Sequence, residues 1–186
     1  MNYVNSVSTS GLIHHLSKKK NSSYFPFSIR QETSWTDGSA RKDFLNARAF
    51  RDDLRELLAG LDEGTPILVK GFLRSSKGSG ELFLDVTEAE TLPELGDVIN
   101  NVELSGAFHV IKAQNEGVTG IGKYTRFAVK QEDPVNGKDF IVVRVYDEDM
   151  RKVLAGKNDD DPVSVHGSLR SSRGSGVNYV MCSKIE

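Results

Sequence analysis

The sequence contains a single cysteine, no long apolar run and no strong excess of either charge. With Cys182 alone the chain cannot form an internal disulfide, which excludes a small disulfide-stapled scaffold. A membrane helix needs about 20 consecutive apolar residues, and a signal peptide needs a shorter apolar segment near its N-terminus. The sequence shows neither pattern. Its composition, 38% apolar and 27% charged, is typical of globular proteins, so we expect a cytoplasmic protein.

Motifs that carry catalytic or metal-binding chemistry are missing as well. Segment 71–78 lacks the Gly-Lys-Ser/Thr ending of a phosphate-binding loop. The adjacent residues His14 and His15 would point to opposite faces of a strand, with no cysteine or carboxylate nearby at ligand spacing. The acidic run 159–161 lacks the glycine and the terminal glutamate of a calcium loop. We therefore expect no enzyme activity, no cofactor and no metal.

An internal repeat is the most informative feature that the sequence does contain. Segment 44–80 and segment 140–176 agree at 17 of 37 positions without a gap, at an offset of 96 residues. Shorter matches upstream extend each copy to roughly ninety residues, which is longer than the units of repeat arrays and typical of two domains in tandem. The Pro/Gly break at residues 91–96 predicts domains at 1–92 and 97–186, which we call repeat one and repeat two.

Each repeat has the periodicity of five strands and one short helix. In repeat two, apolar residues alternate with polar ones over five segments, and the helix is predicted between the third and fourth of them. Three strands, a helix and two strands in this order predict an all-β fold of two tandem OB-fold barrels. Gly60 and Gly156 follow the helices and favour left-handed helix ends. The five segments are Val102–Ile111, Tyr124–Gln131, Phe140–Tyr146, Val163–Leu169 and Val177–Ile185, and the helices are Asp52–Leu58 and Glu148–Leu154.

The third strand of each repeat combines an apolar face with a face of aromatic residues and arginine. Alternate residues of a strand point to opposite sides, and one side of segments 44–50 and 140–146 is wholly apolar. The other side places an arginine between aromatic residues, which suits base stacking and phosphate pairing without sequence preference. The same alternation in the second and fourth strands adds further outward residues. The residues predicted to bind nucleic acid are Tyr24, Arg30, Trp35, Phe44, Arg48, Phe50, Phe72, Arg74, Lys77, Tyr124, Arg126, Lys130, Phe140, Arg144, Tyr146, Arg170 and Arg173.

The order of these motifs resembles the bacterial-type single-stranded DNA-binding proteins. Asn-x-Val-x-Leu-x-Gly, Phe-Ala-Val, Phe-Ile-Val-Val-Arg-Val-Tyr, a short helix and Val-x-Val-x-Gly-x-Leu-Arg follow one another in repeat two, with matching positions in repeat one. The resemblance covers essentially the whole chain, once per repeat. It implies OB-folds that assemble in groups of four and wrap single-stranded DNA, so that a chain with two copies would act as a homodimer.

The resemblance also assigns individual stacking positions and shows where this chain departs from the family. Aromatic residues at the two ends of the third strand stack on bases in the family, and these positions match Phe44 and Phe50 in repeat one and Phe140 and Tyr146 in repeat two. Trp35 lies within about a residue of a third stacking position. The hairpins at 77–80 and 173–176 are shorter than in many members and carry no ring. The sequence stops at residue 186 without the acidic tail of the family, so either recruitment of replication or repair enzymes is not expected or the tail has been truncated.

We expect this protein to bind and protect single-stranded DNA, independently of sequence, in replication, recombination or repair. We expect it in the cytoplasm, associated with the nucleoid. A net charge of −2 requires that any basic surface arise by segregation of charge rather than by excess. The modest net charge and the short hairpins also suit an OB-fold adaptor, such as a primosome-type subunit, which would bind protein partners. Binding of single-stranded RNA is a second alternative, because only local geometry distinguishes the 2′-hydroxyl.

Overall fold

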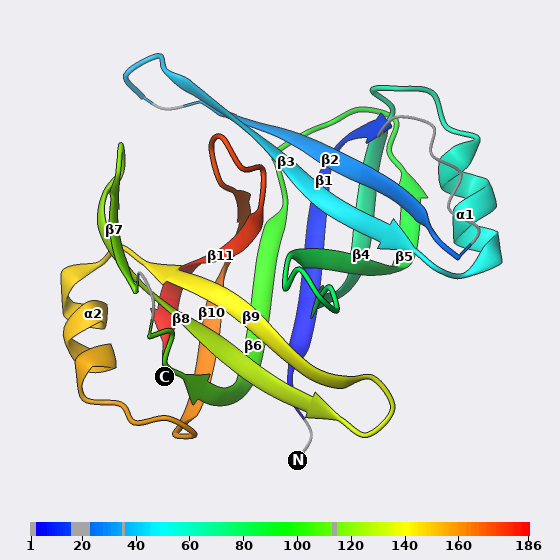
Figure 1. The fold of residues 1–186 in the computed structure, drawn as a ribbon. Helices are drawn as coiled ribbons and strands as arrows, with labels where there is room; N and C mark the ends of the chain where they lie inside the picture. Colours follow the sequence, from blue (N-terminus) through cyan, green and yellow to red (C-terminus); the bar gives the residue numbers. More distant parts are fainter. Residues whose placement is uncertain (1–2, 16–22, 35, 113–114) are drawn as a thin grey trace.

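The computed structural model describes residues 3–15, 23–34, 36–112 and 115–186 as two β-barrels side by side, each with one short helix (Figure 1). Trp35 lies outside the described residues. In these ranges no helix is long and apolar enough to cross a membrane. Repeat one contains β1 (Asn5–His15), β2 (Phe25–Ser34), β3 (Ala40–Ala49), α1 (Asp52–Ala59), β4 (Pro66–Ser75) and β5 (Leu82–Thr91). Repeat two contains β6 (Asn100–His109), β7 (Glu116–Thr119), β8 (Gly122–Asp133), β9 (Gly137–Val145), α2 (Glu148–Ala155), β10 (Pro162–Ser171) and β11 (Asn178–Ile185).

The strands of each repeat close into a barrel, which confirms the predicted OB-fold. In repeat one β1 pairs with β2 and β4, β2 pairs with β3, and β5 joins β3 in parallel and β4 in antiparallel fashion. Strands β6, β8, β9, β11 and β10 form the same ring in repeat two. The additional strand β7 pairs with the start of β8 and was not predicted from the sequence. Its four residues, EGVT, are too few to show an alternating pattern.

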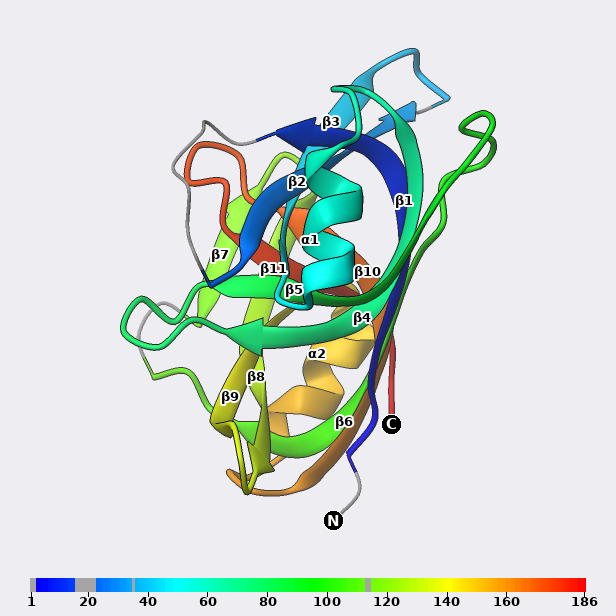
Figure 2. The same cartoon turned by 90° about the vertical axis from the view of Figure 1, so that its right-hand side faces the viewer.

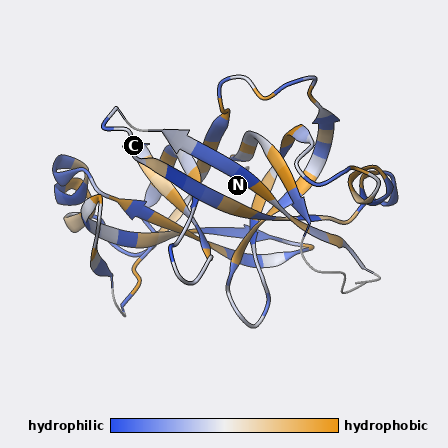
Figure 3. Cartoon of the chain, turned by 90° about the horizontal axis from the view of Figure 1, so that it is seen from above, coloured by the Kyte–Doolittle hydropathy of each residue, from blue (hydrophilic) through white to orange (hydrophobic). Residues whose placement is uncertain are grey.

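The third strands alternate between core and surface as predicted. Leu45, Ala47 and Ala49 are at most 1% exposed, and their counterparts in β9 are fully buried. Figure 3 shows the resulting stripes of apolar and polar residues along the strands. Gly71 and Gly167 lie where β4 and β10 bulge against the last strand of their barrels, and a Cβ at either residue would overlap a carbonyl oxygen of that strand. Glycine is therefore required at both positions.

The turns follow the predicted glycine pattern, but the helix ends do not. Gly38 and Gly137 have positive φ in the hairpins between the second and third strands, which confirms these turns. Gly60 and Gly156, by contrast, have φ of −84° and −94°, so the predicted left-handed helix ends are wrong. In both helices the backbone N–H of this glycine donates to carbonyls of the last turn. The helix ends are therefore closed without a left-handed residue.

An approximate two-fold axis relates the two repeats and passes through the pair β1–β6. These strands are antiparallel, with Val7 opposite Val102 at the centre of the pairing. All eleven strands thereby form one continuous sheet (Figure 2). Flanking side chains tie the repeats together in the same way on both sides. Asn5 donates to Gln131 at 2.8 Å, and Asn100 donates to Gln31 at 2.8 Å.

A second tie between the repeats joins the start of each third strand to the end of the other repeat's fourth strand. The Asp43 carboxylate accepts the backbone N–H of Ser171 at 2.9 Å, and Asp139 accepts that of Ser75 at 2.8 Å. The β2–β3 hairpin reaches toward repeat two and the β8–β9 hairpin toward repeat one (Figure 1). Each barrel therefore has a hairpin of the other repeat beside it.

Candidate nucleic-acid interface

The outward face of the third strand is exposed in both repeats. Phe44, Phe50 and Phe140 have 36–38% of their surface accessible, although large apolar side chains are usually buried. Arg48 lies between Phe44 and Phe50, Arg144 occupies the same position after Phe140, and both arginines are half-buried. The strand alternation that fills the core with small apolar side chains thus turns these rings and guanidinium groups toward solvent.

In repeat one the Arg48 guanidinium lies between two aromatic rings. Its Cζ is 4.9 Å from the centre of the Tyr24 ring and 4.0 Å from that of Phe83. Nη2 donates to the Ser76 hydroxyl at 2.7 Å, which fixes the plane of the group. Phe50 packs on Tyr24 with ring centres 5.3 Å apart. Cation–π contacts on both faces hold the arginine and align the rings beside it.

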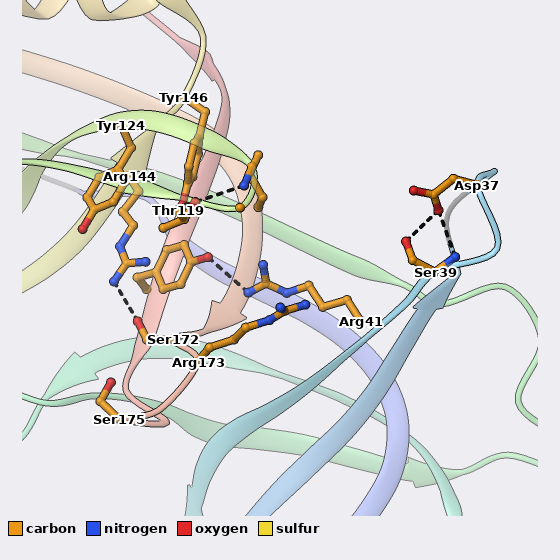
Figure 4. A pocket seen from close by; sticks show the side chains of 13 residues that line it. Asp37, Ser39, Arg41, Thr119, Tyr124, Arg144, Tyr146, Ser172, Arg173 and Ser175 are labelled. Atoms are coloured by element: carbon orange, nitrogen blue, oxygen red, sulfur yellow. Dashed lines mark hydrogen bonds between the residues drawn. The ribbon is translucent and has the colours of Figure 1, made fainter.

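Repeat two has the same arrangement, with tyrosine in place of phenylalanine (Figure 4). The Arg144 Cζ is 4.8 Å from the Tyr124 ring centre and 3.8 Å from that of Tyr179. Its Nη2 donates to Ser172 at 2.7 Å, and Tyr146 packs on Tyr124 with centres 5.4 Å apart. We call each set an aromatic–arginine ladder. Its members are Tyr24, Arg48, Phe50 and Phe83 in repeat one, and Tyr124, Arg144, Tyr146 and Tyr179 in repeat two.

Phe83 and Tyr179 are parts of the ladders that sequence reasoning missed. They occupy equivalent positions of β5 and β11 and are 5% and 2% exposed, so the alternation alone would place them in the core. They reach the arginines because the last strand runs parallel beside the third, with Arg48 opposite Asp85. The signal available in the sequence was an aromatic residue at the same position of both copies.

A histidine packs against the first exposed ring of each third strand and was also missed. The rings of His14 and Phe44 are 5.2 Å apart, and those of His109 and Phe140 are 4.9 Å apart. A carboxylate holds each imidazole: Glu63 contacts His14 at 2.6 Å, and Asp159 lies 3.1 Å from His109. The backbone N–H of His15 donates to Glu63, and that of Val110 donates to Asp159. These hydrogen bonds lower the pKa of both carboxyls. Both carboxylates are therefore ionised at neutral pH.

The predicted cations differ in whether they already have partners. Arg74 lies 3.5 Å from Asp85, Arg170 lies 3.0 Å from Asp43, and Lys130 contacts Asp160. Arg30 is 3.9 Å from Glu32, Arg126 is half-buried in β8, and the hairpin residues Lys77 and Arg173 are exposed. Phe72 and Arg74 line a cavity of about 580 Å³ at the junction of the repeats, together with the acidic residues of the β8–β9 hairpin. Among the described residues, no member of a ladder lines that cavity. The paired arginines are thus held by carboxylates, whereas the hairpin cations extend into solvent.

A cavity of about 650 Å³ lies beside the ladder of repeat two. Its walls include Tyr124, Arg144, Tyr146 and Tyr179, and the hairpin residue Arg173 (Figure 4). Strand β3 of repeat one adds Arg41, which the sequence reasoning also missed. The cavity is open to solvent and wide enough for a planar heterocycle, and it combines aromatic surface with positive charge.

No family model matches the sequence, and no curated protein matches it significantly. Among solved structures, the chain is similar to the wild-type single-stranded DNA binding protein from Thermus aquaticus, with a TM-score of 0.76 and 17% identity over 100% of this chain and 93% of that one. A deletion mutant of the same protein gives a TM-score of 0.71 and 17% identity, covering 99% and 94% of the two chains. At this identity the likeness shows that the whole chain shares the fold of that protein.

Proposed function

We propose that this protein binds single-stranded DNA without sequence specificity and protects it during replication, recombination or repair. The observation that carries the proposal is the aromatic–arginine ladder, which occurs once on the outward face of each barrel. Every base has a π-face, so a row of fixed rings binds single strands of any sequence, at about 1–3 kcal/mol per stacked base. A duplex hides these faces, so the rings select unpaired DNA.

The exposed cations next to the ladders supply contacts to the backbone. Lys77 and Arg173 occupy matching positions in the β4–β5 and β10–β11 hairpins, beside Ser76 and Ser172. A strand whose bases stack on the ladder would place its phosphates near these cations. The fold similarity to a protein named for single-stranded DNA binding supports the same function. We propose that the binding requires no catalysis, metal or cofactor.

We further propose that the chain acts as a homodimer that presents four OB-folds, on the nucleoid of the cytoplasm, with its domains divided as 1–92 and 97–186. The proposed boundary falls between the end of β5 at Thr91 and the start of β6 at Asn100. A dimer would place four ladders on one particle, and linked sites bind one strand with a high effective concentration. Sedimentation of the free protein and of its DNA complex measures this stoichiometry.

Substitution of one exposed ring per ladder tests the function. Phe50→Ala combined with Tyr146→Ala removes one stacking ring from each repeat, and we expect the affinity for a labelled oligo-dT of about 35 nucleotides to fall more than tenfold. Fluorescence anisotropy at two salt concentrations measures both the affinity and its salt dependence. The matched control is Leu57→Ala with Val153→Ala, which shortens exposed apolar side chains on α1 and α2.

The outcomes of this experiment separate the candidate functions. Wild-type affinity in a folded Phe50→Ala/Tyr146→Ala variant would refute the stacking assignment. No binding by the wild-type protein at low salt would refute the function itself and favour a protein-binding adaptor. Tighter binding of oligo-U than of oligo-dT would identify RNA as the ligand.

A further inference from the structure

The two ladders are nearly equivalent, but the charges beside them are not. In repeat two the cavity is lined by three arginines and one aspartate, a net charge of +2. One of these arginines, Arg41, belongs to repeat one. The site of repeat two is therefore built from both repeats. The position in β9 of repeat two that corresponds to Arg41 is Gly137, which has no side chain to add to the site of repeat one.

Arg41 is fixed in place by groups from both repeats. Its Nη2 donates to the Ser171 carbonyl at 2.9 Å and to the Tyr179 phenol at 3.2 Å, and its Nε lies 3.1 Å from the Asp43 carboxylate. Within the ranges that the structure describes, Nη1 donates to no acceptor. The guanidinium thus presents one edge to the protein and keeps donors for a ligand in the cavity.

The cluster around Asp43 carries an uncompensated positive charge. One buried carboxylate, 0% exposed, pairs with both Arg41 and Arg170, at 3.1 and 3.0 Å. The pKa of Asp43 is lowered, because although burial opposes ionisation, the Ser171 N–H and the Arg41 guanidinium outweigh it. Two guanidinium groups against one carboxylate leave a charge of +1 in a partly desolvated place, which favours an anion.

Repeat one has the opposite charge at the equivalent junction. Asp139 takes the place of Asp43 and accepts the Ser75 N–H and hydroxyl, while Arg74 pairs with Asp85 instead. Two carboxylates thus stand against one guanidinium. A separate cavity at this junction, which does not include the ladder of repeat one, is lined by Arg74, Glu132, Asp133 and Asp139, a net charge of −2. A phosphate would be repelled there.

From this difference we propose that Arg41 of repeat one is a phosphate-binding residue of the repeat-two site and makes that site the tighter of the two. The ligand is a backbone phosphodiester of a strand whose bases stack on Tyr124 and Tyr146, with Arg41 and Arg173 beside it. This inference rests on the proposed function, and it assigns an order to the two repeats. Charge-assisted bonds from guanidinium to phosphate are strong and planar, which suits a fixed arginine better than a mobile lysine.

The test measures Arg41→Gln in two backgrounds of the full chain. Phe44→Ala with Phe50→Ala weakens repeat one, and Phe140→Ala with Tyr146→Ala weakens repeat two. We expect Arg41→Gln to reduce oligo-dT affinity about fivefold or more in the first background, with a log–log salt slope smaller by about 0.7, the value for one lost contact. In the second background the change should stay below twofold. Lys42→Gln is the matched control, because it removes the same charge from an adjacent, exposed position of β3.

Each outcome decides between the proposals. One contrary result is that Arg41→Gln leaves the affinity of the first background unchanged, and another is that it lowers the affinity of both backgrounds equally. Either result would show that Arg41 only ties the repeats together. Absence of any wild-type binding would instead remove the proposed function. Should Arg41→Gln unfold the protein, the two backgrounds by themselves still test the order: the repeat-two pair must lose more affinity than the repeat-one pair, and the reverse order overturns the inference.

Discussion

Replacement of Asp43 by alanine should destabilise the protein far more than the same change at the equivalent Asp139. Asp43 is fully buried and accepts hydrogen bonds from Ser171 N at 2.9 Å, Arg170 at 3.0 Å and Arg41 at 3.1 Å. Its removal leaves two guanidinium groups, with side chains only 9% and 13% exposed, facing each other without a counter-ion. Breaking such a buried pair costs about 3–5 kcal/mol.

Asp139 provides the internal control, because it occupies the matching position with a lighter role. Asp139 is half-buried, and among the described residues its carboxylate accepts only from the Ser75 N–H at 2.8 Å and the Ser75 hydroxyl at 3.0 Å, so its loss leaves none of their cations without a partner. Two neutral donors that lose their partner near the surface cost about 1–2 kcal/mol. The expected difference in free energy of unfolding between Asp43→Ala and Asp139→Ala is therefore about 2–3 kcal/mol.

Urea unfolding at neutral pH, followed by circular dichroism, measures both variants, and the midpoint shift with an unchanged slope reports the free energy. Equal costs, or a cost below about 1 kcal/mol for Asp43→Ala, would refute the account of a buried Arg–Asp–Arg cluster. Asp43→Ala combined with Arg170→Met separates the two contributions, since it removes one of the stranded cations and should recover part of the loss. A double variant as unstable as Asp43→Ala would mean that the lost hydrogen bonds, and not the charge, set the cost.

Two further predictions concern titration and reactivity. The pKa of Asp43 is lower in the folded chain than in the unfolded one, so its stabilisation is present above about pH 4 and is lost as the pH falls through the folded value. Thermal unfolding between pH 6 and 2.5 should show this loss in the wild type and a smaller one in Asp43→Asn. Burial raises the pKa of the Cys182 thiol to about 11, so it should react with a disulfide reagent at pH 8 far more slowly in the folded chain than in denaturant. Equal rates would show that the thiol is accessible.

The parts of the fold that could be predicted from the sequence depend on local periodicity. The apolar faces of Leu45 to Ala49 and Ile141 to Val145 alternate without exception, so the buried and exposed sides of the third strands follow from the chain alone. The internal repeat adds strength, because the same pattern occurs twice. Strand β7 and the helix ends were not predicted correctly, since four residues give no periodicity and a terminal glycine fits right-handed as well as left-handed ends.

The parts of the site that were missed depend on contacts between distant segments. Phe83 and Tyr179 join the ladders only because the last strand lies parallel to the third. His14 and His109 lie beside Phe44 and Phe140 because the second strand of each barrel pairs with both the first strand and the third. Arg41 contacts Tyr179 across 138 positions of sequence and between two repeats. No spacing within one repeat carries that information.

The approximate two-fold axis explains how one chain can hold two similar platforms of unequal charge. The backbone pairing of β1 with β6 places the β2–β3 hairpin beside the ladder of repeat two and the β8–β9 hairpin beside Phe72 and Arg74 of repeat one, so a residue of one hairpin acts on the opposite barrel. A substitution in a single hairpin therefore changes a single site, which identical chains related by exact symmetry could not do. Arg41 against Gly137, and Thr33 against Asp133 opposite them, are such differences. In the proposed function, the charges at the junction, more than the rings, decide where a strand is held first, because phosphate attraction acts at longer range than stacking.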